Sequence, residues 1–139
     1  MTGGYVLEDD ADGNLGLGEA APLRTVAGFV ELETTGQGLR YGLFAGYFAN
    51  LGSGETLDFT AAGPDDPANV FARGANIDHG WRVAPRLVYD AGKVRFGFEL
   101  PIDTVLYASA LDPEFAPDPL DDDESVTNVR ADFSVFLFF

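Results

Sequence analysis

Charged side chains alternate with apolar ones along several stretches of the chain, and all but one of the bases are arginines. The planar guanidinium group of arginine binds a carboxylate or a phosphate through two hydrogen bonds at once. Alternate positions of a strand share a face, so such residues would form one polar wall. The candidate set is Arg40, Asp78, Arg82, Arg86, Lys93, Arg95, Glu99, Asp103, Arg130 and Asp132. Its excess of bases favours contact with small anions, whereas the alternative is that the charges pair across strands, at ~0.2–1 kcal/mol each.

A second candidate site lies near the start of the chain, where acidic residues have the spacing of a calcium-binding loop. Loop positions 1, 3, 5, 7 and 12 fall on Glu8, Asp10, Asp12, Asn14 and Glu19. Glu8 stands where Asp is usual, and Pro22 follows too soon for a flanking helix. The alternative is a solvated acidic loop, and the same two interpretations apply to the acidic run 121–124. Calcium is the one cofactor that the sequence suggests.

Motifs for catalysis and for nucleic-acid binding are absent. The segment Gly52-Ser53-Gly54 lacks the Gly-x-Ser-x-Gly pattern of a nucleophile elbow, and there is no phosphate loop or dinucleotide motif. His79, the single histidine, falls beside Trp81 on an apolar face, where an aromatic belt would lie. The net charge of −15 disfavours nucleic acid as a partner. We therefore expect neither an enzyme nor a nucleic-acid-binding protein.

The elements that would hold the charged wall are stretches in which apolar and polar residues alternate. We expect an all-β fold, an antiparallel up-and-down meander of about five long strands within 23–139, at about 23–34, 39–50, 77–89, 93–107 and 126–139. Short turns are predicted at 35–38 and 90–92, where the turn residue glycine occurs. Long loops are predicted at 1–22, 51–76 and 108–125. Pro101 cannot donate to a ladder, so it predicts a bulge or weakened pairing in the fourth strand.

Acidic residues are concentrated in the three predicted long loops. These loops hold sixteen of the 23 acids and a single base, Arg73, and the other seven bases lie in the stretches between them. A uniformly solvated globule has no reason to separate its charges in this way.

The last predicted strand ends the chain on an aromatic residue. Its apolar positions, a candidate assembly signal, are Phe133, Val135, Leu137 and Phe139. Only Phe136 and Phe138 break the alternation. Such an ending is typical of the closing strand of a bacterial outer-membrane β-barrel, whose outward face meets lipid and whose inward face meets water. With Phe139 at the periplasmic rim, both short turns become periplasmic and the acidic loops extracellular.

Much of the chain resembles the C-terminal hairpins of Gram-negative porins, in particular the DcaP-type porins. The similar segments are 82–89 (RVAPRLVY), 91–100 (AGKVRFGFEL), the strand that ends in Phe138 and Phe139, and 46–52 (GYFANLG). The resemblance covers roughly residues 39–139. It implies a trimeric, sixteen-stranded channel for small, often anionic, solutes. This chain would correspond to the C-terminal third of such a barrel.

Five strands leave two open edges, and open lipid-exposed edges do not occur within the hydrocarbon layer. We therefore expect further strands, from a missing N-terminal part or from copies of the same chain. No secretory signal precedes the first segment, so we expect a processed chain or a fragment. The expected function is an outer-membrane porin segment for passive diffusion of small, anionic solutes, with outer-membrane lipid as a partner. The alternatives are a homo-oligomeric barrel built from several copies, or a soluble β-sandwich or small β-barrel that acts as a binding or structural module.

Overall fold

A computed structural model of the chain describes residues 4–7, 20–54, 56, 70–71, 74, 76–112, 114–118 and 124–139. Its strands are β1 (Gly4–Leu7), β2 (Ala20–Leu23), β3 (Thr25–Glu33), β4 (Leu39–Asn50), β5 (Val70–Phe71), β6 (Ile77–Ala91), β7 (Val94–Glu99), β8 (Ile102–Tyr107), β9 (Glu124–Val129) and β10 (Asp132–Leu137). The described residues form no helix. Within these ranges, nothing therefore qualifies as an apolar helix long enough to cross a membrane.

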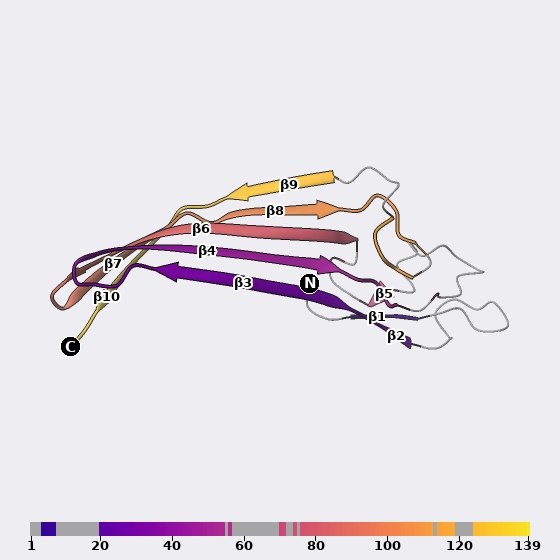
Figure 1. The fold of residues 1–139 in the computed structure, drawn as a ribbon, viewed down its shortest axis with the longest axis horizontal. Coiled ribbons are helices and arrows are strands. Elements are labelled where there is room, and N and C mark those ends of the chain that lie inside the picture. Colours follow the sequence, from indigo (N-terminus) through magenta and orange to yellow (C-terminus); the bar gives the residue numbers. More distant parts are fainter. Residues whose placement is uncertain are drawn as a thin grey trace. The chain divides into compact units, whose positions relative to one another are not determined.

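Most of the strands belong to one antiparallel sheet that follows the order of the chain. Its order is β10-β7-β6-β4-β3, and β8 pairs with β6 and with β9 (Figure 1). Because β8 continues β7 and β10 continues β9, the sheet contains the five expected long strands, each next to its neighbour in sequence. The predicted all-β, antiparallel up-and-down meander is confirmed.

The two C-terminal long strands are both interrupted, and the interruptions lie next to each other. The predicted strand 93–107 is broken at Leu100 and Pro101, and the predicted strand 126–139 is broken at Arg130 and Ala131. The Arg130 amide donates to the Pro101 carbonyl at 3.0 Å, and the Leu100 amide donates to the Pro85 carbonyl at 3.0 Å. The weakened pairing predicted from Pro101 is therefore found, and it extends into the neighbouring strand.

Both short turns and the chain end meet at one end of this sheet. The Thr34 amide donates to the Tyr41 carbonyl at 2.8 Å across the first turn, and the Asp90 amide donates to the Gly38 carbonyl at 3.1 Å, which joins the two turns. β6 runs to Ala91, so the second turn is Gly92–Lys93, one residue later than predicted. The positive φ of Gly92, 65°, suits a two-residue hairpin turn. The Phe138 amide donates to the Lys93 carbonyl at 2.9 Å.

The chain divides into two compact units, which are described separately. Unit 1 consists of Met1–Val26, Phe48–His79 and Val105–Ser125, and unit 2 of Ala27–Tyr47, Gly80–Thr104 and Val126–Phe139. Unit 2 contains β7 and β10, together with most of β3, β4 and β6. The candidate charged wall lies in unit 2, with the exception of Asp78.

Unit 1 contains a small sheet that the sequence does not predict. β1 pairs with β2 and with β5, in the order β2-β1-β5. The loop predictions for 1–22 and 51–76 are therefore wrong at these three strands. Each strand has only two to four residues, which is too short for an alternating pattern to stand out. The buried cluster of this unit is Val6, Ala21, Leu23 and Phe115, with Leu111 packed against it.

The segment around Asp112, inside the predicted loop 108–125, is held in a tight turn. One Asp112 carboxylate oxygen accepts hydrogen bonds from the amides of Glu114 at 2.9 Å and Ala116 at 2.8 Å. This turn places Phe115 at a φ of 60° with its side chain fully buried. The Ser53 amide donates to the Glu114 carbonyl at 2.7 Å, which ties the turn to the segment after β4.

Candidate functional site

The pairing of β6, β7 and β10 aligns residues of similar polarity in rows across unit 2. Residues directly opposite each other on neighbouring strands share a face of the sheet. The apolar rows are Leu87–Phe98–Phe133, Tyr89–Phe96–Val135 and Ala91–Val94–Leu137. The rows on the other face are Arg86–Glu99–Asp132, Val88–Gly97–Ser134 and Asp90–Arg95–Phe136. The faces predicted for these strands one by one therefore coincide across all three.

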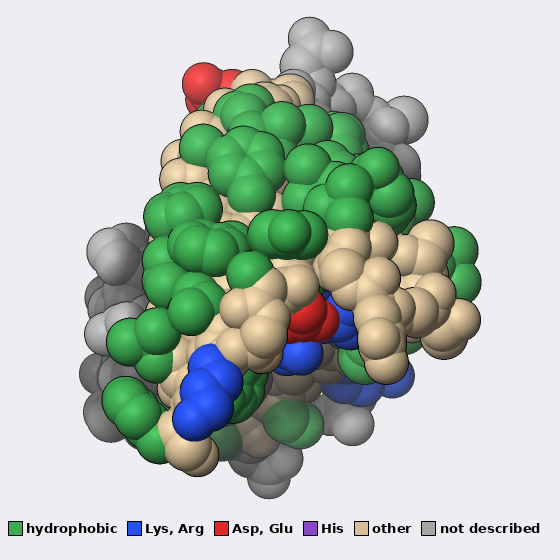
Figure 2. All heavy atoms as spheres, turned by 90° about the vertical axis from the view of Figure 1, so that its left-hand side faces the viewer, with side chains coloured by type: hydrophobic (Ala, Val, Ile, Leu, Met, Phe, Trp, Pro, Cys, Tyr) green, Lys and Arg blue, Asp and Glu red, His purple; other side chains and the backbone are tan. Residues whose placement is uncertain are grey.

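The apolar face is exposed. Leu87 is 40%, Leu137 61% and Phe133 70% exposed, although the Phe96 and Phe133 rings stack with centroids 6.4 Å apart. Figure 2, seen from the end with the turns, shows hydrophobic side chains covering much of the surface, while blue and red charged side chains gather in a hollow below them. Contiguous exposed apolar surfaces are uncommon on monomeric soluble proteins, and a large one marks a surface for binding a partner, a ligand or a membrane.

The candidate assembly signal lies on the apolar face, as the alternation predicts. Phe133, Val135 and Leu137 lie in the apolar rows, and Phe139 follows β10 as an exposed residue. Phe136, one of the two residues that break the alternation, lies in the row of Arg95. The other is Phe138, whose ring centroid lies 5.4 Å from the Arg95 guanidinium carbon. Phe136 is thus opposite Arg95 in the register, and Phe138 forms a cation–π contact with the same arginine.

Asp90 bridges two arginines near the turns. Its carboxylate accepts a hydrogen bond from Arg95 Nε at 2.6 Å and one from Arg40 at 3.1 Å. Arg40 also donates to Glu33 at 2.9 Å. These contacts link one charged residue from each of β3, β4, β6 and β7 into a single network of ion pairs.

Asp103 bridges a second pair of arginines on the same face. It accepts a hydrogen bond from Arg82 Nε at 2.5 Å and one from Arg130 at 3.5 Å. Arg86 forms an ion pair with Glu31 of β3. All five arginines of the candidate set therefore form ion pairs with carboxylates on other strands, as the alternative interpretation predicted.

The predicted excess of bases on this face is not found within unit 2. Three carboxylates that the prediction does not include, Glu31, Glu33 and Asp90, pair with its arginines. The bases that strands place on the face are Arg40, Arg82, Arg86, Arg95 and Arg130, and its acids are Glu31, Glu33, Asp90, Glu99, Asp103 and Asp132. Five arginines therefore meet six acids, and Lys93 lies in the second turn. Asp78 instead contacts His79 Nδ1 at 2.7 Å in unit 1.

These three acids are missed for two reasons. Glu31 and Glu33 alternate with Phe29 on the same face of β3, so the alternation does not identify a polar face there. Asp90 falls in a predicted turn, whereas the structure places it inside β6. The spacing of two residues between Glu31 and Glu33 places both carboxylates on one face and is a signal that could have found these two acids, but it gives no indication of Asp90.

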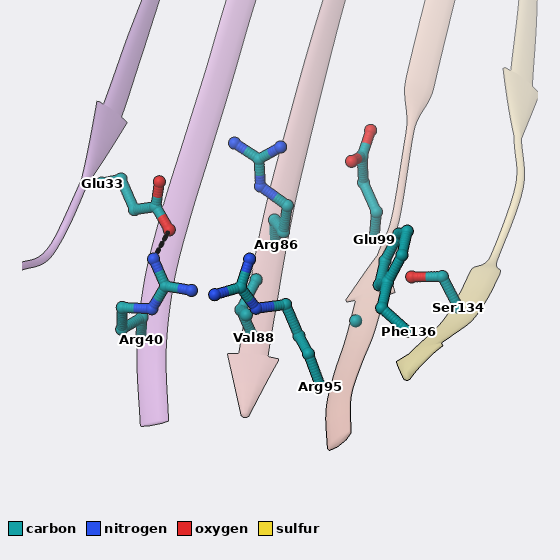
Figure 3. A pocket seen from close by; sticks show the side chains of 9 residues that line it. Glu33, Arg40, Arg86, Val88, Arg95, Glu99, Ser134 and Phe136 are labelled. Carbon is teal, nitrogen blue, oxygen red and sulfur yellow. Dashed lines mark hydrogen bonds and ion pairs between the residues drawn. The ribbon is translucent and has the colours of Figure 1, made fainter. Parts of the chain in front are cut away.

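A hollow of about 360 Å³ lies on the charged face. Its lining residues, here called the arginine hollow, are Glu33, Arg40, Arg86, Val88, Arg95, Gly97, Glu99, Ser134 and Phe136. In Figure 3 the three guanidinium groups gather on one side, and Glu99, Ser134 and Phe136 lie on the other. Four of these residues, Arg40, Arg86, Arg95 and Glu99, belong to the set of candidates predicted from the sequence. The pairing of the strands adds the other five, which are Glu33, Val88, Gly97, Ser134 and Phe136.

Two glycines make space in and beside this hollow. A Cβ atom added at Gly42 would lie 3.2 Å from Arg86 Nε, and one added at Gly97 would lie 2.5 Å from Ser134 Oγ. A side chain at Gly97 would therefore displace Ser134, and one at Gly42 would crowd Arg86.

The calcium prediction is not tested by the structure. Glu8, Asp10, Asp12, Asn14 and Glu19 lie outside the described residues, as do positions 121–123. Among the residues that are described, no three His, Cys, Asp or Glu side chains form a group that could hold a metal ion.

Unit 2 thus presents one sheet with an exposed apolar face and a charged face that carries the arginine hollow. Comparisons of the chain with models of protein families, with curated proteins and with solved structures found no match. The resemblance to DcaP-type porins stays a prediction, and a function must be inferred from the geometry of this sheet.

Proposed function

We propose that the sheet of unit 2 forms part of the wall of a porin, a transmembrane β-barrel in the outer membrane of a Gram-negative bacterium. Its apolar face would contact lipid, and its charged face would line a water-filled channel for small solutes that carry an anionic group. The observation that carries the proposal is the strand register, which collects apolar residues on one exposed face and charges on the other. Barrel walls have this alternation.

Aromatic residues on the apolar face support its contact with lipid. Tyr41 and Tyr89 lie near the short turns, and Tyr47 and Trp81 lie six and eight residues further along β4 and β6. All four are exposed. At ~3.3 Å per residue the two groups are separated by roughly 20–26 Å, close to the ~25 Å apolar band that aromatic girdles flank in outer-membrane barrels. Between them lie the aliphatic residues Leu43, Val83 and Leu87.

The edges of the sheet support the need for further strands. β3 pairs with β4 alone and β10 with β7 alone in the described part of the chain. Every residue of these two strands is exposed. Because unpaired backbone groups cost several kcal/mol each in lipid, a barrel needs strands at both edges. These would come from more of the same polypeptide or from further copies of the chain, and the porin resemblance implies assembly of complete barrels into trimers.

The arginine hollow supports passage of solutes with a carboxylate or phosphate group. Arg40, Arg86 and Arg95 come from three neighbouring strands and present their guanidinium groups to one space. Their carboxylate partners reduce the net charge, but a guanidinium with one ion pair retains N–H donors. Anion contact along this wall would therefore depend on individual arginines rather than on an overall positive charge.

The test is purification followed by measurement of conductance in a planar lipid bilayer. We expect the protein to require detergent or lipid, and the reconstituted channel to prefer chloride to potassium in a salt gradient. The double variant Arg82→Glu with Arg86→Glu should shift the reversal potential toward that of potassium. The matched double variant Arg82→Gln with Arg86→Gln should produce about half of the shift, because it removes charge without reversing it.

Other outcomes would refute the proposal in distinct ways. A stable, monodisperse protein in detergent-free buffer would exclude the membrane assignment and favour a soluble β-sandwich or small β-barrel. Channels formed by chains of this length alone would favour the homo-oligomeric barrel. A cation-selective channel that is indifferent to both double variants would exclude the anion contact.

A further inference from the structure

The arginine hollow contains one carboxylate, that of Glu99, which forms no salt bridge in the described part of the chain and interacts with Arg82 at longer range. Glu99 lies directly opposite Arg86 in the register of β6 and β7. Arg86 nevertheless forms its ion pair with Glu31. In the part of the chain that the structure describes, no side chain forms a salt bridge with the Glu99 carboxylate. A negative group therefore faces the hollow on the side opposite the guanidinium groups (Figure 3).

The positive side of the hollow retains donors for a ligand. Arg86 pairs with Glu31, and Arg95 pairs with Asp90 through Nε at 2.6 Å and Nη2 at 3.4 Å. Each guanidinium carries five N–H donors, so both groups keep donors that can reach a carboxylate placed in the hollow. Two guanidiniums around one carboxylate give charge-assisted hydrogen bonds, the stronger kind.

The space between the two charged sides is lined by less polar groups. Val88 and Gly97 lie opposite each other in the register, and Gly97 is also opposite Ser134. Phe136 presents an aromatic ring that is 53% exposed. Such a ring accepts either an apolar group or a cation at its face. The Ser134 hydroxyl, on the same side as Glu99, can accept a hydrogen bond from an ammonium group.

The geometry points to a binding site for small zwitterions of the α-amino acid class in the arginine hollow. The carboxylate of the ligand binds Arg86 and Arg95, its ammonium group binds Glu99 with help from Ser134, and its side chain lies against Val88 and Phe136. This assignment deepens the proposed function, on which it rests, because it identifies the solutes that the wall would favour. The volume of about 360 Å³ is in the range of small-molecule sites.

Solutes with a single charge fit the hollow less well. A plain carboxylate would bind the arginines but leave Glu99 without a partner and close to a second negative charge. A plain amine would bind Glu99 but approach three guanidinium groups. A ligand with both charges avoids both repulsions, and the near balance of five arginines and six acids on this face agrees with such a ligand.

The experiment compares three probes that share an aliphatic chain. L-Norvaline carries both charges, pentanoate lacks the ammonium group, and butylamine lacks the carboxylate. Binding of each to the full chain in detergent micelles is measured by ligand-observed NMR titration, which does not depend on channel formation. We expect norvaline to bind about tenfold more tightly than either of the others. Tenfold corresponds to about 1.4 kcal/mol, which is close to the contribution of one hydrogen bond to a charged group.

Substitutions in the hollow then test whether the preference for norvaline arises there. Glu99→Gln should reduce norvaline affinity to that of pentanoate and leave pentanoate binding unchanged or slightly tighter. Ser134→Ala should weaken the binding of norvaline by a smaller factor than Glu99→Gln does, and it should leave the binding of pentanoate unchanged. This variant tests the same site if Glu99→Gln does not fold. The matched control Glu124→Gln, at the start of β9 and outside the hollow, should leave the tenfold preference intact.

Equal affinity of the folded wild-type chain for norvaline and pentanoate would overturn the zwitterion site. So would a preference that survives Glu99→Gln and Ser134→Ala. The bilayer measurement separates this result from the proposed function. A conducting channel without the norvaline preference refutes the site alone, whereas a norvaline preference without conductance refutes the channel and leaves the site.

Discussion

The Arg86 side chain runs beside Gly42 of the neighbouring strand, where an added Cβ atom would lie 3.2 Å from Arg86 Nε and 3.6 Å from Arg86 Cβ. The missing side chain lets Arg86 cross β4 and pair with Glu31 of β3. Glu99, which is opposite Arg86 in the register, is thereby left to face the hollow. The open space at Gly42 thus accommodates the arginine side chain on its way to Glu31.

Gly42→Val should break the Arg86–Glu31 ion pair. A double-mutant cycle of Arg86→Ala and Glu31→Ala, measured by denaturant unfolding in micelles, should give a coupling of about 0.5–1 kcal/mol in the wild-type background, as for exposed ion pairs. The coupling should vanish in the Gly42→Val background. Gly28→Val is the control, because a Cβ atom there meets nothing within 4 Å. A coupling that persists in the Gly42→Val background would show that Gly42 does not direct the pairing.

Asp90→Asn should make the proposed channel more selective for anions. The Asp90 carboxylate is shared by Arg40 and Arg95, at 3.1 Å and 2.6 Å, so its neutralisation leaves one more uncompensated positive charge on the wall. The reversal potential in a potassium chloride gradient should move toward that of chloride. Glu124→Gln removes one negative charge outside this network and should have a smaller effect. An unchanged potential, or a shift toward potassium, would contradict the role of Asp90.

Leu87→Lys and Val88→Lys should differ strongly in stability although they are neighbours in sequence. Leu87 lies in an apolar row, opposite Phe98, and Val88 lines the hollow, opposite Gly97. A lysine on the lipid face costs about 2–4 kcal/mol at the middle of the bilayer and less toward the interfaces, so roughly 1.5–3 kcal/mol is expected at position 87, two residues from Tyr89, whereas a lysine at position 88 would point into water. Unfolding in lipid vesicles should show a loss of that size for Leu87→Lys and of less than about 1 kcal/mol for Val88→Lys. Equal losses would count against lipid on the apolar face.

Phe115→Ala should loosen the core of unit 1, and Phe115→Gly should loosen it less. Loss of a fully buried phenylalanine costs about 3–5 kcal/mol. Phe115 has a φ of 60°, a conformation that costs a residue with a Cβ atom roughly 1–2 kcal/mol and that glycine adopts freely. Hydrogen exchange at the Ser53 amide, which donates to the Glu114 carbonyl at 2.7 Å, reports the opening. Protection that falls equally in both variants would mean that the backbone of Phe115 is not strained.

The long strands of the sheet were predictable because alternation persists over many residues. The predicted strand 39–50 coincides with β4, and the interruption at Pro101 follows from its missing N–H. The break at Arg130 and Ala131 was not predictable from its own residues, because it lies beside Pro101 on the neighbouring strand. β1, β2 and β5 escaped prediction because two to four residues cannot display a period.

By itself, the sequence determined the type of sheet and the division of most residues between two faces, since alternate side chains of a strand must point to opposite sides. It therefore brought Arg86, Arg95 and Glu99 to one face. Only the tertiary structure decided how these charges pair, because a long arginine side chain reaches whichever carboxylate the neighbouring strands leave accessible. Arg86 passes beside Gly42 to pair with Glu31 of β3, and Glu99 is left facing the arginine hollow.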